Sequence, residues 1–132
     1  MQLRAKGKFK VSHDTIRIVT DVGFSQFYRW LFIRAHYFTQ NLQIPKHGSH
    51  VTVISPKIHK VDCTKWMSLN NKEVYFNYDI TGNYGGLSKG FLNFWFDIKC
   101  PEAEAILDDY GFKKQDGFSL LHITIGNNKH LR

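Results

Sequence analysis

Cysteine and proline are scarce in this chain, with two and three copies among 132 residues. The cysteines, Cys63 and Cys100, lack the CxxC spacing of redox and zinc motifs. We therefore expect two reduced, buried thiols. This pattern excludes a disulfide framework and gives no reason to place a metal at either cysteine.

Long apolar runs are also missing. The most apolar stretch, residues 24–38, is interrupted by Arg29, Arg34 and His36, so it predicts no membrane-spanning helix. The first ten residues, MQLRAKGKFK, carry charges without an apolar segment behind them, so they predict no secretory signal. We expect a cytoplasmic protein with no membrane partner.

Acidic residues are outnumbered by basic ones. The chain has 11 Asp and Glu against 18 Lys and Arg, and the net charge of +7 favours polyanionic partners such as nucleotides or nucleic acid. Near the N-terminus, cations stand at every second position, as on a strand with one positive face: Arg4, Lys6, Lys8 and Lys10. Such a face either protects a solvated edge strand from pairing or contacts phosphate, and the sequence leaves both open.

Apolar and aromatic residues are present in globular proportion, at 42% and 15%. At this length the composition predicts one domain, residues 1–132, with a substantial core. Residue patterns predict two strands, a helix and a strand, and then the same order again. The first strands are expected at residues 7–11, 15–20 and 50–54, with a helix from Phe24 onward.

The second half is expected to have strands at residues 72–80, 90–98 and 119–125. A helix should begin at Pro101, which suits a first helical position, and stop before Gly111. The glycine-rich link TGNYGGLSKG between two of these strands lacks the GxxxxGK[ST] spacing of a phosphate-binding loop. We interpret it as a hairpin loop.

Each half ends in a strand with the same polar pattern. In SHVTVI, His50 and Thr52 alternate with apolar residues, and in LHITIG, His122 and Thr124 do so. Successive strand residues point to opposite faces, so each strand presents a histidine and a threonine together. Two imidazoles can act as general base and general acid across one phosphodiester, and hydroxyls can donate to its oxygens.

These paired motifs resemble the two Hh[TS]h signatures of the 2H phosphoesterase superfamily, which includes bacterial RNA ligase-like proteins and eukaryotic cyclic phosphodiesterases. The resemblance implies an α+β fold of two pseudo-symmetric lobes, about residues 1–60 and 61–132, with antiparallel sheets lining a central cleft and helices outside. It also implies metal-independent phosphodiester chemistry without a cofactor. The catalytic residues it implies are His50, Thr52, His122 and Thr124.

A narrower similarity concerns LRAKGKFKV, FYRW and IPKHGSHVTV, which are similar to segments of the phage anti-CBASS family. Those small 2H enzymes degrade the cyclic oligonucleotide signals of bacterial immunity. The similarity implies a cyclic di- or oligonucleotide substrate, cleavage of 3'-5' linkages and action in the host-cell cytoplasm. Only eight residues follow Thr124, so we expect another loop or subunit to close the site.

Further substrate contacts are expected from residues outside the motifs. Aromatic rings can stack on a base and lysines can contact phosphate. The candidates are Lys8, Lys10, Tyr28, Tyr84 and Trp95. His47 precedes His50 by three residues but has no carboxylate or cysteine at ligand spacing, so no metal site is expected there.

Two other functions remain open from the sequence. One is an RNA-end enzyme of the 2H type, either a 2',3'-cyclic phosphodiesterase or an RNA ligase-like protein. The other is a non-catalytic basic module in which the histidines only contact phosphate.

Overall fold

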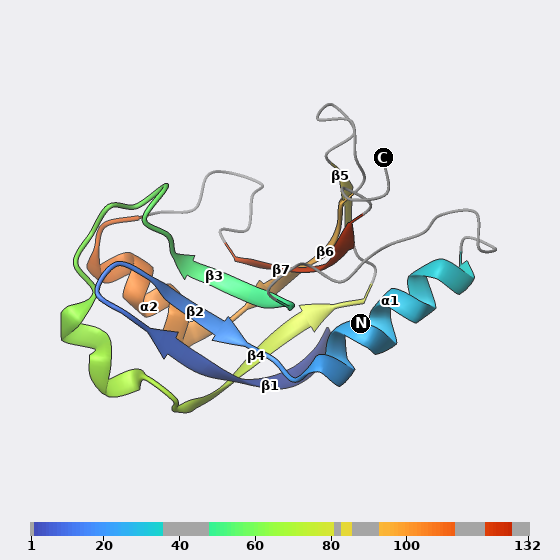
Figure 1. Ribbon diagram of the computed structural model, residues 1–132, viewed down its shortest axis with the longest axis horizontal. Helices are drawn as coiled ribbons and strands as arrows, with labels where there is room; N and C mark the ends of the chain where they lie inside the picture. The colour runs from blue at the N-terminus through green and yellow to red at the C-terminus, as the bar shows by residue number, and fades with distance from the viewer. Residues whose placement is uncertain (1, 36–47, 81–82, 86–92, 113–120, 128–132) are drawn as a thin grey trace.

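The computed structural model describes residues 2–35, 48–80, 83–85, 93–112 and 121–127 (Figure 1). Its elements are β1 (Gln2–Val11), β2 (Ile16–Val19), α1 (Val22–Ala35), β3 (His50–Ile54), the 3₁₀ helix η1 (Thr64–Leu69), β4 (Glu73–Asp79), β5 (Asn83–Gly85), β6 (Asn93–Lys99), α2 (Pro101–Asp109) and β7 (His122–Asn127).

The strands close into one antiparallel barrel. Their order is β4-β1-β2-β3-β7-β6, and a further pairing of β4 with β6 closes the ring, while β5 flanks β6. The expected α+β class with antiparallel strands is confirmed. The finer expectation differs: the two halves do not form separate sheets, because β4 of the second half pairs along β1 of the first.

Most expected elements are found within a few residues of their predicted positions. The strand at 50–54 is β3, and the helix beginning at Pro101 is α2. Two elements were not predicted. The short strand β5 lies inside the link expected to be all loop, and η1 lies in a stretch without periodicity. A strand of three residues has too little pattern of its own, and β5 is defined by its pairing with β6.

Side-chain alternation divides the barrel into an apolar interior and a polar outer face. In β1 every second residue from Gly7 to Val11 is buried, while Lys6 and Lys8 are exposed. β1 is not an edge strand, because it pairs with β2 on one side and β4 on the other. Its cations therefore do not serve the edge-protecting role that the sequence had left open.

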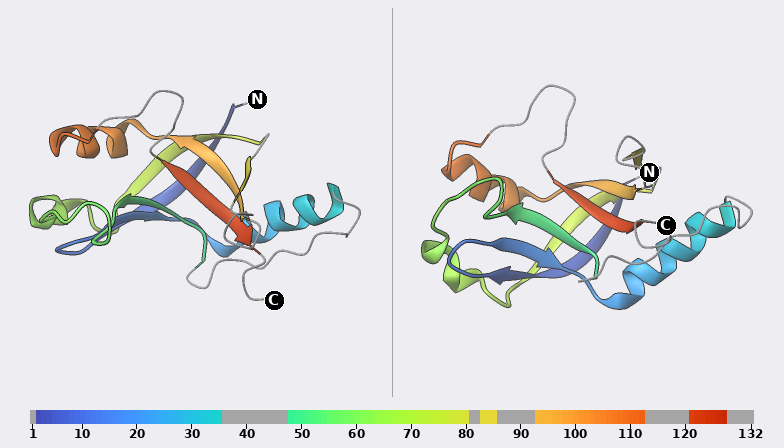
Figure 2. Two further views of the ribbon diagram at one scale, coloured as in Figure 1. Left: turned by 90° about the horizontal axis from the view of Figure 1, so that it is seen from above. Right: turned by 45° about the horizontal axis from the view of Figure 1, so that its top comes forward.

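The two helices pack at opposite ends of the barrel (Figure 1, Figure 2). The Asp21 carboxylate accepts a hydrogen bond of 3.0 Å from the backbone N–H of Phe24, and so caps the first turn of α1. The rings of Phe24, Tyr28 and Phe32 on α1 then pack against aromatic residues of β4 and β6. α2 buries Ala103, Ile106 and Leu107.

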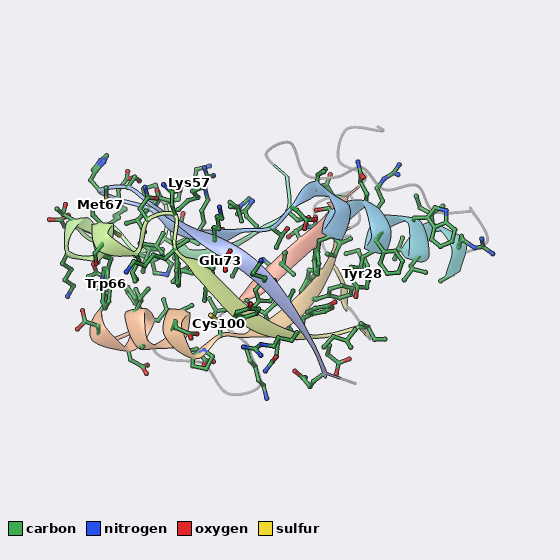
Figure 3. The ribbon with its side chains drawn as sticks, turned by 90° about the horizontal axis from the view of Figure 1, so that it is seen from below. Tyr28, Lys57, Trp66, Met67, Glu73 and Cys100 are labelled. Atoms are coloured by element: carbon green, nitrogen blue, oxygen red, sulfur yellow. The ribbon has the colours of Figure 1, made fainter. Side chains whose placement is uncertain are left out.

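At the α2 end, η1 adds a second layer. Trp66 lies on η1 on the side toward α2 (Figure 3), and the Tyr110 hydroxyl, just past α2, donates to the Asp62 carbonyl at 2.5 Å. Both cysteines are free thiols buried in this region, as expected. Burial raises the pKa of the Cys100 thiol to about 11, so it stays protonated and unreactive at neutral pH. Within the described residues, neither helix has the length and apolarity needed to cross a membrane.

Candidate active site

The two His-x-Thr strands are neighbours in the barrel. β3 and β7 run antiparallel with Val51 opposite Ile123, and both of these side chains are fully buried (Figure 1). One step along an antiparallel ladder in either direction pairs His50 with Thr124 and Thr52 with His122. Because direct neighbours in a sheet share a face, all four motif side chains lie together on the outer face.

The histidines are diagonal neighbours in this arrangement. Side chains at such positions have Cβ atoms roughly 7 Å apart, a span that one phosphodiester can occupy. Desolvation, and to a smaller extent repulsion by nearby His50, lower the pKa of His122. Both rings are accessible, since His50 is half-buried and His122 is exposed.

The approach to β3 holds His50 in one orientation. Gly48 has a φ of +76°, a left-handed conformation that favours glycine, and its carbonyl oxygen lies 3.1 Å from His50 Nδ1. A carbonyl oxygen only accepts hydrogen bonds, so Nδ1 carries a proton, and Nε2 is the ring nitrogen left to exchange a proton with a ligand. Buried Ser49 donates its hydroxyl to the Thr124 carbonyl at 2.7 Å and thereby ties β3 to β7.

On β7, His122 is placed between Trp95 and Asp97 of the next strand. Asp97 stands opposite His122 and Trp95 stands opposite Thr124, with the Trp95 and His122 ring centroids 6.5 Å apart. Desolvation lowers the pKa of His122, and the negative charge of Asp97 opposes this effect. The net effect is a lowered pKa, although the His122 side chain keeps exposed surface. Neutral imidazole is then the dominant form at pH 7.

The outer face continues to the other side of the motifs. Arg17 on β2 stands opposite Thr52, and Lys10 on β1 stands opposite Arg17. Lys8 stands opposite Val19, which in turn faces His50. The predicted contacts Lys8 and Lys10 therefore lie on the same face as the motifs, two strands from β3.

The remaining aromatic candidates are placed differently. Trp95 lies beside His122, as described above. Tyr28 packs on the interior side, with its ring 4.9 Å from Phe96 and its hydroxyl 2.5 Å from that of Tyr78, so it belongs to the aromatic core (Figure 3). Tyr84 lies on β5 with its backbone opposite Phe94. Its side chain lies outside the described part, as does His47.

Sequence reasoning missed three residues at this site. Ser49 and Asp97 have no motif, and their roles follow only from the pairing of β3, β7 and β6. Arg17 could have been found, because the alternation in TIRIVT puts it on the polar face of its strand.

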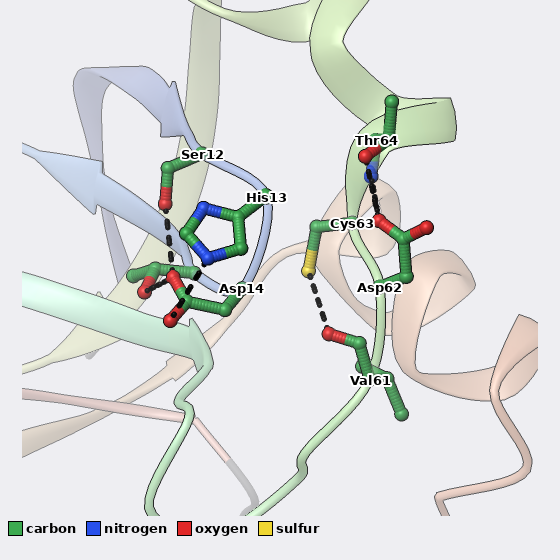
Figure 4. Close-up of polar contacts among 8 residues, drawn as sticks. Ser12, His13, Asp14, Val61, Asp62, Cys63 and Thr64 are labelled. Carbon is green, nitrogen blue, oxygen red and sulfur yellow. Dashed lines mark hydrogen bonds and ion pairs between the residues drawn. The ribbon is translucent and has the colours of Figure 1, made fainter.

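Other titratable groups lie elsewhere. His13 is exposed on the β1–β2 turn and its Nε2 is 3.6 Å from the Asp14 carboxylate, which also accepts from Ser12 (Figure 4). His59 accepts a 2.8 Å hydrogen bond from the Ser55 backbone N–H, and burial lowers its pKa. In the part of the chain described, no three His, Cys, Asp or Glu side chains form a cluster that could hold a metal ion.

No protein-family description, curated protein or solved structure matches the chain.

Proposed function

We propose that the protein is a metal-independent phosphodiesterase of the 2H type that cleaves 3'-5' linkages in cyclic di- or oligonucleotides. The observation that carries this proposal is the pairing of β3 with β7, which brings two histidines and two threonines, 72 positions apart in sequence, onto one accessible face. Two imidazoles and two hydroxyls are the groups that in-line transfer at a phosphodiester needs.

The reaction uses one histidine at each end of the displacement. The base removes the proton from a ribose 2'-hydroxyl, and that oxygen attacks the adjacent phosphorus. The bond from phosphorus to the 5'-oxygen breaks, and the other histidine protonates the leaving oxygen. The products are a 2',3'-cyclic phosphate and a free 5'-hydroxyl. Thr52 and Thr124 donate hydrogen bonds to the non-bridging oxygens, where charge increases in the transition state.

The environments of the two histidines support a division of roles. His122 has a lowered pKa and is mainly neutral at pH 7, which suits the base. His50 then acts as the acid in its doubly protonated form: Nε2 gives its proton to the leaving 5'-oxygen, while Nδ1–H stays hydrogen-bonded to the Gly48 carbonyl. We assign proton acceptance to His122 and proton donation to His50.

The substrate class follows from charge and from the family resemblance. The outer face carries Lys8, Lys10 and Arg17 beside the motifs, which favours a polyanionic substrate. The similarity to the anti-CBASS family narrows this to cyclic oligonucleotide signals, and the biological role to phage counter-defence in the host cytoplasm.

Turnover assays with matched variants test the proposal. The purified protein is incubated in excess EDTA with a 3',3'-cyclic dinucleotide and with an RNA that ends in a 2',3'-cyclic phosphate. His50→Ala and His122→Ala should each reduce turnover by about a hundredfold or more. His13→Ala, on the distant β1–β2 turn, should not. Turnover of the RNA alone would favour the RNA-end enzyme, and binding without turnover of either would favour a non-catalytic module.

Two modified substrates test the chemical steps. A fully deoxy cyclic dinucleotide lacks the attacking hydroxyl and should resist cleavage, and equal cleavage would contradict the mechanism. A substrate with sulfur in place of the bridging 5'-oxygen has a leaving group that needs no proton. It should restore activity to His50→Ala but not to His122→Ala. Restoration of His122→Ala instead would reverse the assigned roles.

A further inference from the structure

Beside the motif residues lies a pair of cations whose charges no described carboxylate balances. Lys10 on β1 and Arg17 on β2 stand directly opposite each other, and Arg17 also stands opposite Thr52. Like charges at directly opposed positions of a sheet are destabilising. Both strands are paired on two sides, so protection of an edge does not explain the charges.

The charges of this pair are not neutralised by nearby acids. In the described part of the chain no carboxylate forms an ion pair with Arg17, and Lys10 donates to the neutral side-chain oxygen of Asn71. The acid closest to Arg17 in sequence, Asp14, is occupied by its own turn, where it accepts from Ser12 and Thr15 (Figure 4).

The neighbouring cations of β1 are engaged in another way. Lys6 forms an ion pair of 3.5 Å with Glu73, and the Arg4 guanidinium lies 4.1 Å above the centre of the Tyr75 ring. Lys6 and Arg4 are thus held by residues of β4, whereas Lys8, Lys10 and Arg17 form no ion pair with a described carboxylate.

We propose that Arg17 and Lys10 form a subsite for a second phosphate, next to the one that is cleaved. The proposal rests on the proposed phosphodiesterase function and specifies its substrate. Strand spacing of about 4.8 Å puts the Arg17 backbone roughly 10 Å from that of His122, within reach of the next phosphate of a nucleotide chain. A substrate that fills both positions carries at least two phosphates, one nucleotide apart. A mononucleoside cyclic phosphate has only one phosphate and cannot fill both.

The position of Trp95 gives the substrate a direction across the face. Trp95 lies on β6, on the opposite side of β7 from Arg17, and it is half-buried beside His122. Its ring can stack on a base. The nucleotide is therefore bound with its base toward β6, its reacting phosphate at the β3–β7 junction and its second phosphate toward β2.

Linear substrates that differ by one phosphate test the subsite. The dinucleotide ApA contains a single phosphodiester, whereas pApA and ApAp carry one more phosphate, and 3',3'-cyclic di-AMP contains two. Arg17→Gln should lower kcat/KM about tenfold or more, mainly through KM, for 3',3'-cyclic di-AMP and for one of pApA and ApAp, the one whose extra phosphate lies toward β2, because the lost charge-assisted hydrogen bonds to phosphate are each stronger than a neutral one. It should leave ApA within about twofold.

Matched variants separate this effect from general loss of charge. Arg4→Gln makes the same chemical change on the same outer face, near β4, and should alter no substrate by more than about twofold. Arg17→Lys should restore part of the loss, because a lysine keeps the charge without the bidentate fork. Equal loss on ApA and on the two-phosphate substrates, or no loss on either, would overturn the subsite.

A binding measurement keeps the two proposals distinguishable. If no substrate is turned over, the phosphodiesterase function fails, and fluorescence anisotropy with a labelled 3',3'-cyclic di-AMP still reports on the subsite. Arg17→Gln should weaken that binding about tenfold while Arg4→Gln does not. Equal binding by wild type and Arg17→Gln would overturn the subsite.

Discussion

The hydrogen bond from Ser49 to β7 offers a sharp test of how the site is held together. Its hydroxyl donates to the Thr124 carbonyl at 2.7 Å, and Ser49 is only 5% exposed. Ser49→Ala removes this bond and leaves the carbonyl without that donor, at an expected loss of about 1–2 kcal/mol. For 132 residues the unfolding entropy is about 0.28 kcal/mol/K, so Tm should fall by about 4–7 °C.

The same substitution should affect activity more than its effect on stability suggests. Ser49 directly precedes His50 and binds the backbone of Thr124, so it aligns one motif with the other. Differential scanning fluorimetry measures Tm, and initial rates below the melting range measure kcat and KM. We expect a lower kcat at temperatures where Ser49→Ala is fully folded.

The control is a serine whose hydrogen bond is exposed. Ser12 donates to Asp14 at 3.3 Å on the β1–β2 turn, and Ser12→Ala should change stability by less than about 0.5 kcal/mol. If Ser49→Ala melts no earlier than Ser12→Ala and keeps its kcat, the alignment of β3 with β7 does not depend on this bond.

Three further predictions concern charge and packing. Asp97→Asn removes the charge that raises the pKa of His122, so the acidic limb of the kcat/KM profile should move to lower pH; movement to higher pH would contradict the base assignment. Gly7→Ala should destabilise the fold by about 1–3 kcal/mol, because its Cβ would lie 2.8 Å from a backbone oxygen of β2, whereas Gly23→Ala on α1 meets only a side-chain oxygen at 3.1 Å and should be close to neutral in chemical denaturation. Burial lowers the pKa of His59 below 6.5, so the unfolded chain binds more protons and stability should fall as pH drops below that value. His59→Gln should flatten the profile, and an unchanged slope would argue against this role.

Much of the secondary structure could be predicted from the sequence, because local patterns determine it. Alternation predicted β3, and Pro101 with Gly111 predicted the limits of α2. Local pattern could not predict how the barrel closes. That closure depends on β4 pairing with β1 on one side and with β6 at Asn77 and Tyr78 on the other, contacts between residues far apart in the chain.

The candidate site shows the same division between local and long-range information. The sequence identified both His-x-Thr motifs, since each is contained within one strand. The partners of the histidines come from other strands: Asp97 opposite His122, and Arg17 opposite Thr52. Tyr28 illustrates the reverse case, because nothing in its local sequence distinguishes a base-stacking ring from one that packs in the core.

The sequence by itself determined which side chains each strand presents together, because the two-residue period of a strand is a property of the backbone. It thereby determined the histidine and threonine faces of β3 and β7 and the positive face of β1. Only the tertiary structure decided that β3 and β7 are adjacent, in a register with Val51 opposite Ile123. A shift of one residue would turn one motif toward the core, and burial of the alternate apolar residues makes that shift unfavourable.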